Sequence, residues 1–233
     1  MKKKITNEIT ASAPDSIARG AETVRLLKEI YPTAECSLES GGDPWRLLVM
    51  ARLSAQCTDE RVNIVCRTLF REIPDAKAMA EAPLSQIEEL VKPCGLYRMK
   101  AKSIKEASEI LLRDHGGEVP DTMEELLSLP GVGRKIANLL LGDIFGKGGI
   151  VADTHCMRIC GRLGFYPETL RDPLKVEKIL SPVIEKEEQS DFCHRIVHFG
   201  REYCMARTPV CEKDPRSCPL HGICAHIKNK ESL

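Results

Sequence analysis

Lys135 and Asp153 are the two residues whose types and spacing best suit covalent chemistry. Lys135 lies in the first turn of a helix predicted over 132–145. The positive end of a helix dipole disfavours the ammonium form of a lysine, and a neutral amine is a nucleophile. Residues 133–145 as helix advance roughly 20 Å, and residues 146–152, fully extended, return about 23 Å. We therefore expect the Asp153 carboxylate to reach the Lys135 amine.

The segment before Lys135 has the composition of a phosphate-binding hairpin. A short helix is predicted over 120–127, where Thr122 and Glu125 form a capping box, and Gly131 follows it. Because glycine lacks a Cβ, a phosphate can approach the amides at the start of the next helix closely. Contacts to the phosphate backbone carry no base specificity. The hairpin therefore predicts nucleic-acid binding without sequence preference.

The combination of these features favours a functional site over separate structural roles. Taken singly, a lysine on a helix is usually just solvated, and Asp153 suits the N-cap of a helix that starts near His155. Together, Leu129-Pro130-Gly131-Val132-Gly133-Arg134-Lys135 and the later Asp153-Thr154-His155 resemble the helix-hairpin-helix DNA glycosylases, above all the endonuclease III family. The resemblance extends from about Ile17 to Cys224.

The resemblance implies a base-excision repair enzyme that is both a DNA glycosylase and an AP lyase. Its partner would be double-stranded DNA containing oxidised pyrimidines or abasic sites. Lys135 would attack C1′ of the damaged nucleoside, displace the base and form an imine that permits β-elimination. Asp153 would assist deprotonation of the amine and stabilise cationic character on the sugar. The DNA contacts implied in and beyond the hairpin are Gly131, Val132, Gly133, Arg134 and His155.

Gln56 and Leu96 acquire a function only through the same resemblance. Within Leu53-Ser54-Ala55-Gln56-Cys57-Thr58-Asp59, Gln56 matches the residue that enters the gap left by the flipped nucleotide. Leu96 matches the wedge inserted into the opposite strand. Extruding a base costs about a few kcal/mol, part of which an inserted side chain offsets. Without the resemblance, we would expect Gln56 to bond the carbonyls of its own helix end and Leu96 to belong to the core.

Cys204, Cys211, Cys218 and Cys224 lie within 21 residues, with gaps of six, six and five. Four soft ligands in a proline-rich segment with few apolar residues favour a metal-nucleated loop. Structural zinc sites usually take their ligands in close pairs, whereas wide spacing fits a 4Fe-4S cluster better, and spacing alone leaves both open. The resemblance favours the 4Fe-4S cluster. The family pattern has gaps of six, two and five, so the middle gap here holds four extra residues within 212–217.

The other cysteines and the histidines near these motifs suit structural roles. Cysteine behaves as a small apolar residue when it is buried on a helix. The cysteines expected in the core are Cys57, Cys66, Cys156, Cys160 and Cys193. We expect His155, His194 and His198 to be structural or to contact phosphate.

Composition places the chain among globular proteins, with 233 residues of which 42% are apolar. No apolar run is long enough to cross a bilayer, and the first residues lack the apolar core of a signal peptide. We expect a monomeric cytoplasmic protein, associated with the nucleoid, whose thiols are reduced.

The net charge is zero, from 34 basic and 34 acidic residues, so DNA binding requires a segregated basic face. The residues expected to form it are Arg98, Lys100, Lys102, Lys105, Arg134, Lys135, Arg158 and Arg162.

Apolar residues recur at helical spacing throughout the chain, which predicts an all-α protein. The resemblance implies a two-lobed helix-hairpin-helix glycosylase fold. One lobe is a six-helix barrel over 37–147, and the other joins 1–36 to 148–233 and carries the cluster. DNA would lie between them. The predicted helices are 15–31, 45–56, 59–70, two short ones opened by Pro74 and Pro83, 98–115, 120–127, 132–145, 155–163, 173–184 and 189–203.

Two other functions stay open. Mismatch-specific adenine or thymine glycosylases of the same superfamily are commonly monofunctional, and Lys135 argues against them. Arg52-Leu53-Ser54 also lacks the acidic residue expected near there in the adenine enzyme. From a different class, the chain could be a noncatalytic, metal-stabilised module that binds DNA or senses redox state.

Overall fold

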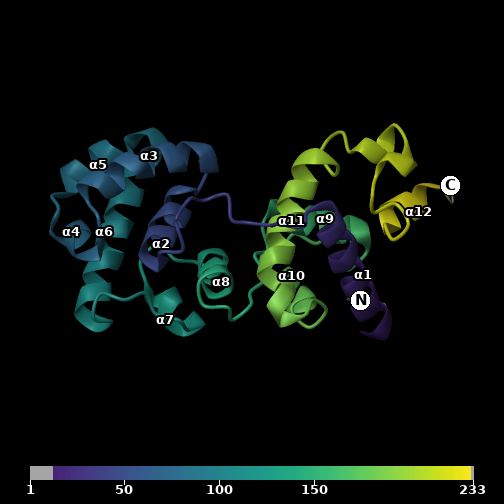
Figure 1. The fold of residues 1–233 in the computed structure, drawn as a ribbon, viewed down its shortest axis with the longest axis horizontal. Coiled ribbons are helices and arrows are strands. Elements are labelled where there is room, and N and C mark those ends of the chain that lie inside the picture. The colour runs from purple at the N-terminus through teal and green to yellow at the C-terminus, as the bar shows by residue number, and fades with distance from the viewer. Residues whose placement is uncertain (1–12, 232–233) are drawn as a thin grey trace, which may run out of the picture. The chain divides into compact units, whose positions relative to one another are not determined.

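The computed structural model describes residues 13–231, and within them the chain forms helices and no β-strand (Figure 1). The predicted all-α class is confirmed. The chain divides into two compact units. One covers residues 36–149, and the other combines the described residues before Cys36 with those from Ile150 onward.

The unit over 36–149 is a helical bundle around one apolar core. Asp43 caps α2 by accepting a hydrogen bond from the Arg46 amide at 2.9 Å, and Thr58 caps α3 by accepting one from the Arg61 amide at 3.3 Å. Both caps satisfy amides that a helix start leaves unpaired. The helices are α2 (Pro44–Leu53), α3 (Asp59–Glu72), α4 (Ala76–Glu81), α5 (Leu84–Val91), the 3-10 helix η1 (Lys92–Cys94), α6 (Tyr97–Asp114), α7 (Met123–Ser128) and α8 (Arg134–Asp143).

Two helix ends that border the candidate site differ from the prediction. The helix from Pro44 ends at Leu53 rather than Gln56, which leaves Gln56 in a loop. The second hairpin helix begins at Arg134 rather than Val132, because the Val132 amide donates to the Leu129 carbonyl in a tight turn and Gly133 is extended. Hydrophobic spacing does not resolve helix ends to this precision.

The second unit has its own core, in which α11 packs against both α9 and α1. Ile159, Phe192, Ile196 and Phe199 are among its most buried residues. None of the helices within residues 13–231 has the length and hydropathy of a membrane span. The helices of this unit are α1 (Ala13–Ile30), α9 (Thr154–Leu163), α10 (Pro173–Leu180), η2 (Lys186–Glu188), α11 (Gln189–Glu202), η3 (Val210–Glu212), η4 (Pro215–Ser217) and α12 (Ala225–Glu231).

Candidate DNA-binding and catalytic site

The hairpin between α7 and α8 presents backbone rather than side chains at its tip. Gly131 has φ +80°, a left-handed conformation, and a Cβ there would lie 2.8 Å from Arg52 Cδ. Only glycine therefore fits this turn. Gly133 is exposed, while the Val132 side chain is buried. No side chain of the described residues caps the start of α8, so the amides of its first turn point toward a place where an anion can bind.

Lys135 is the second residue of α8 and its side chain is exposed. No carboxylate of the described residues pairs with its ammonium group. A lysine at this position shares the first helical turn with the uncapped amides of the hairpin. The structure thus places an exposed amine beside the uncapped start of α8, and its role as the nucleophile stays a prediction.

Asp153 is the N-cap of α9, and its Oδ1 accepts a hydrogen bond from the Cys156 amide at 2.7 Å. The capping role that its residue type favours is therefore confirmed. A cap uses one carboxylate oxygen, and Oδ2 accepts no hydrogen bond from the part of the chain that the structure describes. Capping and proton transfer are thus compatible in one side chain. Asp153 and Lys135 belong to different units, and their approach stays a prediction.

Gln56 and Leu96 share an unusual backbone conformation. Their φ angles are +55° and +48°, and among residues 13–231 no other non-glycine residue has a positive φ. Gln56 is exposed and makes no hydrogen bond to its helix end within the described chain, while Leu96 is 51% exposed. Both structural roles, a helix-end bond for Gln56 and a core position for Leu96, are therefore wrong. Such strain costs about 1–3 kcal/mol per residue and concentrates at functional sites.

The predicted basic face is only partly present. Arg98, Arg134 and Lys135 are exposed. Lys100, in contrast, is only 1% exposed and belongs to the core side of α6. The Lys105 Nζ atom donates a hydrogen bond to the Ala82 carbonyl of the same unit at 3.0 Å. Sequence carries a signal for Lys100, since it falls on the same helical stripe as the buried Ile104, Ala107 and Leu111.

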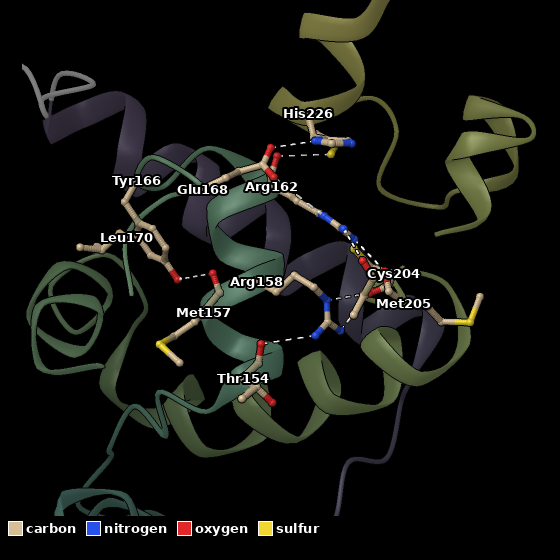
Figure 2. Close-up of polar contacts among 12 residues, drawn as sticks. Thr154, Met157, Arg158, Arg162, Tyr166, Glu168, Leu170, Cys204, Met205 and His226 are labelled. Carbon is tan, nitrogen blue, oxygen red and sulfur yellow. Dashed lines mark hydrogen bonds and ion pairs between the residues drawn. The ribbon is translucent and has the colours of Figure 1, made fainter. Parts of the chain in front are cut away.

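Arg158 and Arg162 hold the start of the cysteine-rich segment instead of facing solvent (Figure 2). Arg158 Nε and Nη2 donate to the Cys204 carbonyl at 3.1 and 2.9 Å. Arg162 Nη1 donates to Cys204 Sγ at 3.2 Å and to the Met205 carbonyl at 2.9 Å. Their prediction as parts of an open basic face is wrong. Because both side chains come from α9, the helix that Asp153 caps also orders this segment.

Two of the three histidines predicted to be structural or phosphate-contacting, His155 and His198, make contacts inside their own unit. His155 Nδ1 lies 3.2 Å from Arg158 Nη2, and its ring packs directly on Gly200 of α11. The His198 ring lies 5.7 Å from the ring of Tyr31. These contacts support the structural role. His155 as a DNA contact stays a prediction.

All four C-terminal cysteines line one cavity, with Phe199, Leu220 and Ile227 among its apolar walls. Cys204 lies two residues after α11, Cys211 lies in η3, Cys218 directly follows η4, and Cys224 directly precedes α12. All four are free thiols. Burial raises the pKa of Cys218 to about 11, so at neutral pH this thiol keeps its proton unless a metal displaces it. Four thiols converging on one apolar cavity fit a metal centre.

The extra residues of the middle gap stay at the surface. Asp214 caps η4 by accepting from the Arg216 amide at 3.0 Å and from Ser217 Oγ at 3.1 Å. Residues 212–214 and 216–217 are exposed. The longer gap is therefore accommodated by a capped turn that leaves Cys211 and Cys218 on the same cavity.

Four of the five other cysteines predicted in the core are buried. Cys66, Cys156, Cys160 and Cys193 are buried on helices. Burial raises the pKa of the Cys66 thiol to about 12. Cys57 is the exception, because it lies in the loop after α2 and is half-buried.

Comparison with known proteins places these features in a family. Residues 49–186 match the family model of the HhH-GPD superfamily of base excision DNA repair proteins. Endonuclease III of Synechocystis sp. is 44% identical over 207 residues, which cover 88% of this chain and 91% of that protein. A solved non-covalent endonuclease III–DNA complex is similar at 37% identity and a TM-score of 0.83, covering 93% of this chain and 99% of the other.

A second solved structure, a trapped endonuclease III–DNA covalent intermediate, is similar at 37% identity and a TM-score of 0.82, covering 92% of this chain and 98% of the other. The chain thus shares its fold with endonuclease III structures and is more than 30% identical to endonuclease III proteins along nearly its full length. It also has the uncapped hairpin and the exposed lysine described above. The chain belongs to the HhH-GPD superfamily of base excision DNA repair proteins and, within it, to the endonuclease III family.

Proposed function

We propose that this protein is a bifunctional DNA glycosylase and AP lyase that excises oxidised pyrimidines from double-stranded DNA and cleaves the strand at the abasic site. The observation that carries the proposal is Lys135, an exposed amine in the first turn of a helix whose amides no described side chain caps. Phosphate binding at those amides would hold a nucleotide beside the nucleophile.

In the proposed reaction, the Lys135 amine attacks C1′ and the bond from C1′ to the base breaks, so that the base leaves with the bonding electrons. Loss of a proton from nitrogen and ring opening give an imine. Removal of a C2′ proton then breaks the C3′–O bond and cleaves the strand. Asp153 accepts the amine proton and stabilises positive charge on the sugar through the carboxylate oxygen that the cap does not use.

Gln56 and Leu96 keep the damaged nucleotide out of the stack. Both side chains are exposed on loops of the same unit, and both loops hold their backbone in the left-handed region. In the proposed complex, Gln56 fills the vacated gap and Leu96 enters the opposite strand. Gly131, Val132, Gly133 and Arg134 contact the DNA backbone, with His155 as a further contact from the other unit.

Cys204, Cys211, Cys218 and Cys224 are proposed to hold a 4Fe-4S cluster, which supplies folding free energy to its segment and takes no part in the chemical step. The wide, unpaired spacing of the four cysteines and the membership of the chain in the endonuclease III family support this assignment. A structural zinc ion usually takes its ligands in close pairs, which this segment lacks.

The proposed function is tested by incubating the protein with duplex DNA that carries one oxidised pyrimidine. We expect release of the damaged base together with strand cleavage at the same site. Base release without cleavage would replace the proposal with a monofunctional glycosylase. DNA binding with neither product would leave only a binding module.

The cluster assignment predicts iron and acid-labile sulfide near four each per chain in anaerobically purified protein. Substituting Cys218 by serine should lower the iron content and the melting temperature, because the segment has little apolar core of its own. The matched control is Cys66→Ala, which removes a buried thiol of α3 outside the cavity and should keep the iron. One zinc ion per chain and no visible absorbance would contradict the cluster.

A further inference from the structure

Lys100 is a buried lysine that the proposed reaction does not use. Its side chain is 1% exposed, and no carboxylate of residues 13–231 forms an ion pair with it. Lysine is almost never fully buried without a partner. Here the partners are two backbone carbonyls: Nζ donates to the Leu53 oxygen and to the Cys94 oxygen, each at 2.8 Å.

These two carbonyls belong to the two loops that carry the proposed DNA-inserting residues. Leu53 is the last residue of α2, three positions before Gln56, and Cys94 is the last residue of η1, two positions before Leu96. Leu53 and Cys94 are 41 positions apart in the sequence. One side chain from α6 therefore connects the starts of two loops that are distant in the sequence.

The same loops contain the strained backbone. Gln56 and Leu96 are the two non-glycine residues with positive φ in the described chain. A residue stays in such a conformation only when its surroundings over-determine it. The two Lys100 hydrogen bonds help to hold these conformations in place, because they fix the backbone shortly before each strained residue.

We propose that Lys100 is a positioning residue, which holds the Gln56 loop and the Leu96 loop at a fixed separation so that both side chains enter DNA together. This inference rests on the proposed function of Gln56 and Leu96. It assigns Lys100 no contact with substrate and no step in the bond chemistry.

An ammonium group suits this task better than the other donors of similar length. It presents three donors around one atom, so it can bond two carbonyls that approach from different directions, whereas the planar guanidinium of arginine favours paired acceptors. Ser103 ties the same helix to the hairpin, because its Oγ donates to the Lys100 carbonyl at 3.0 Å and accepts from Arg52 Nε at 2.8 Å. Arg52 in turn packs on Gly131. Both loops and the hairpin are thus held by α6.

The test is Lys100→Gln, which keeps a polar group but is too short to bond both carbonyls. Under single-turnover conditions we expect excision of an oxidised pyrimidine from duplex DNA to slow by about 10- to 100-fold, the scale of a small misplacement of positioning groups. Borohydride trapping on DNA with a preformed abasic site should stay close to the wild-type rate, because no base has to be extruded. A fluorescent base analogue next to the lesion should lose its signal change on binding.

Ser108→Ala is the matched control. It removes a buried hydroxyl of α6 that accepts the Trp45 Nε1 hydrogen bond at 3.1 Å, away from both loops. We expect a lower melting temperature with excision and trapping in the wild-type ratio. If Lys100→Gln lowers excision and trapping by the same factor, the ratio of the two rates stays at the wild-type value, as in this control. Lys100 is then merely structural and the inference is overturned.

A second variant series keeps the test decisive if Lys100→Gln folds poorly. In a Gln56→Ala/Leu96→Ala background, Lys100→Gln should give no further loss of excision relative to that background, because the side chains it positions are absent. A full additional loss would overturn the inference. Wild-type protein that forms no adduct with abasic DNA would instead refute the proposed function, so the two failures are distinguishable.

Discussion

We expect Lys135→Gln to abolish imine trapping on abasic-site DNA while duplex binding stays close to the wild-type level. The amide of glutamine cannot form an imine, so removing the amine removes the nucleophile itself rather than one of several contributions. Binding survives because the hairpin contacts DNA through backbone amides that the substitution leaves in place. Borohydride trapping on an abasic duplex measures the first effect, and a binding titration measures the second.

The matched control for this variant is Lys77→Gln, which removes an exposed lysine from α4 in the same unit. It should trap at the wild-type rate. Because both variants lose one positive charge from the surface, a nonspecific electrostatic effect would appear in both. Wild-type trapping by Lys135→Gln would show that another amine is the nucleophile.

We expect Asp153→Asn to slow base removal by a factor of about 10²–10⁴, the scale of a lost general acid or base. Asparagine is as good an N-cap as aspartate, so the hydrogen bond from the Cys156 amide and the start of α9 should be preserved. The variant therefore separates the charge from the cap. Single-turnover excision on damaged duplex, with the melting temperature measured in parallel, gives the two readouts.

Asp172→Asn provides the comparison for Asp153. Asp172 caps α10 in the same unit and accepts from the amides of Leu174 and Lys175 at 3.0 and 3.2 Å. It should leave excision unchanged. Equal excision by Asp153→Asn and wild type would reduce Asp153 to the helix cap that the structure shows.

Much of the site is readable from the sequence because its signals are local. The capping hydroxyl of Thr58, the cap at Asp153 and the turn at Gly131 follow from residue types that favour those conformations. The four cysteines are recognisable because few residue types ligate metals and their spacing is confined to one short segment. The all-α class follows from the helical period of the apolar residues.

The features that the sequence does not reveal depend on tertiary packing. Glutamine and leucine carry no local preference for positive φ, so the strain at Gln56 and Leu96 comes from how the surrounding loops are held. The helical stripe of α6 indicates that Lys100 faces the core, but the sequence does not show its two partners, because these carbonyls are far apart in the chain and meet only through packing. The sequence predicts Arg158 and Arg162 on a basic face because nothing in it shows that their partners lie near Cys204.

The most direct test of the proposed catalysis is to map the covalent adduct. Wild-type protein is reduced with borohydride in the presence of abasic-site duplex, digested, and sequenced by mass spectrometry. We expect one modified peptide with the DNA remnant on the Nζ atom of Lys135. The absence of an adduct, or an adduct on a different lysine, would contradict the assignment of Lys135 as the nucleophile.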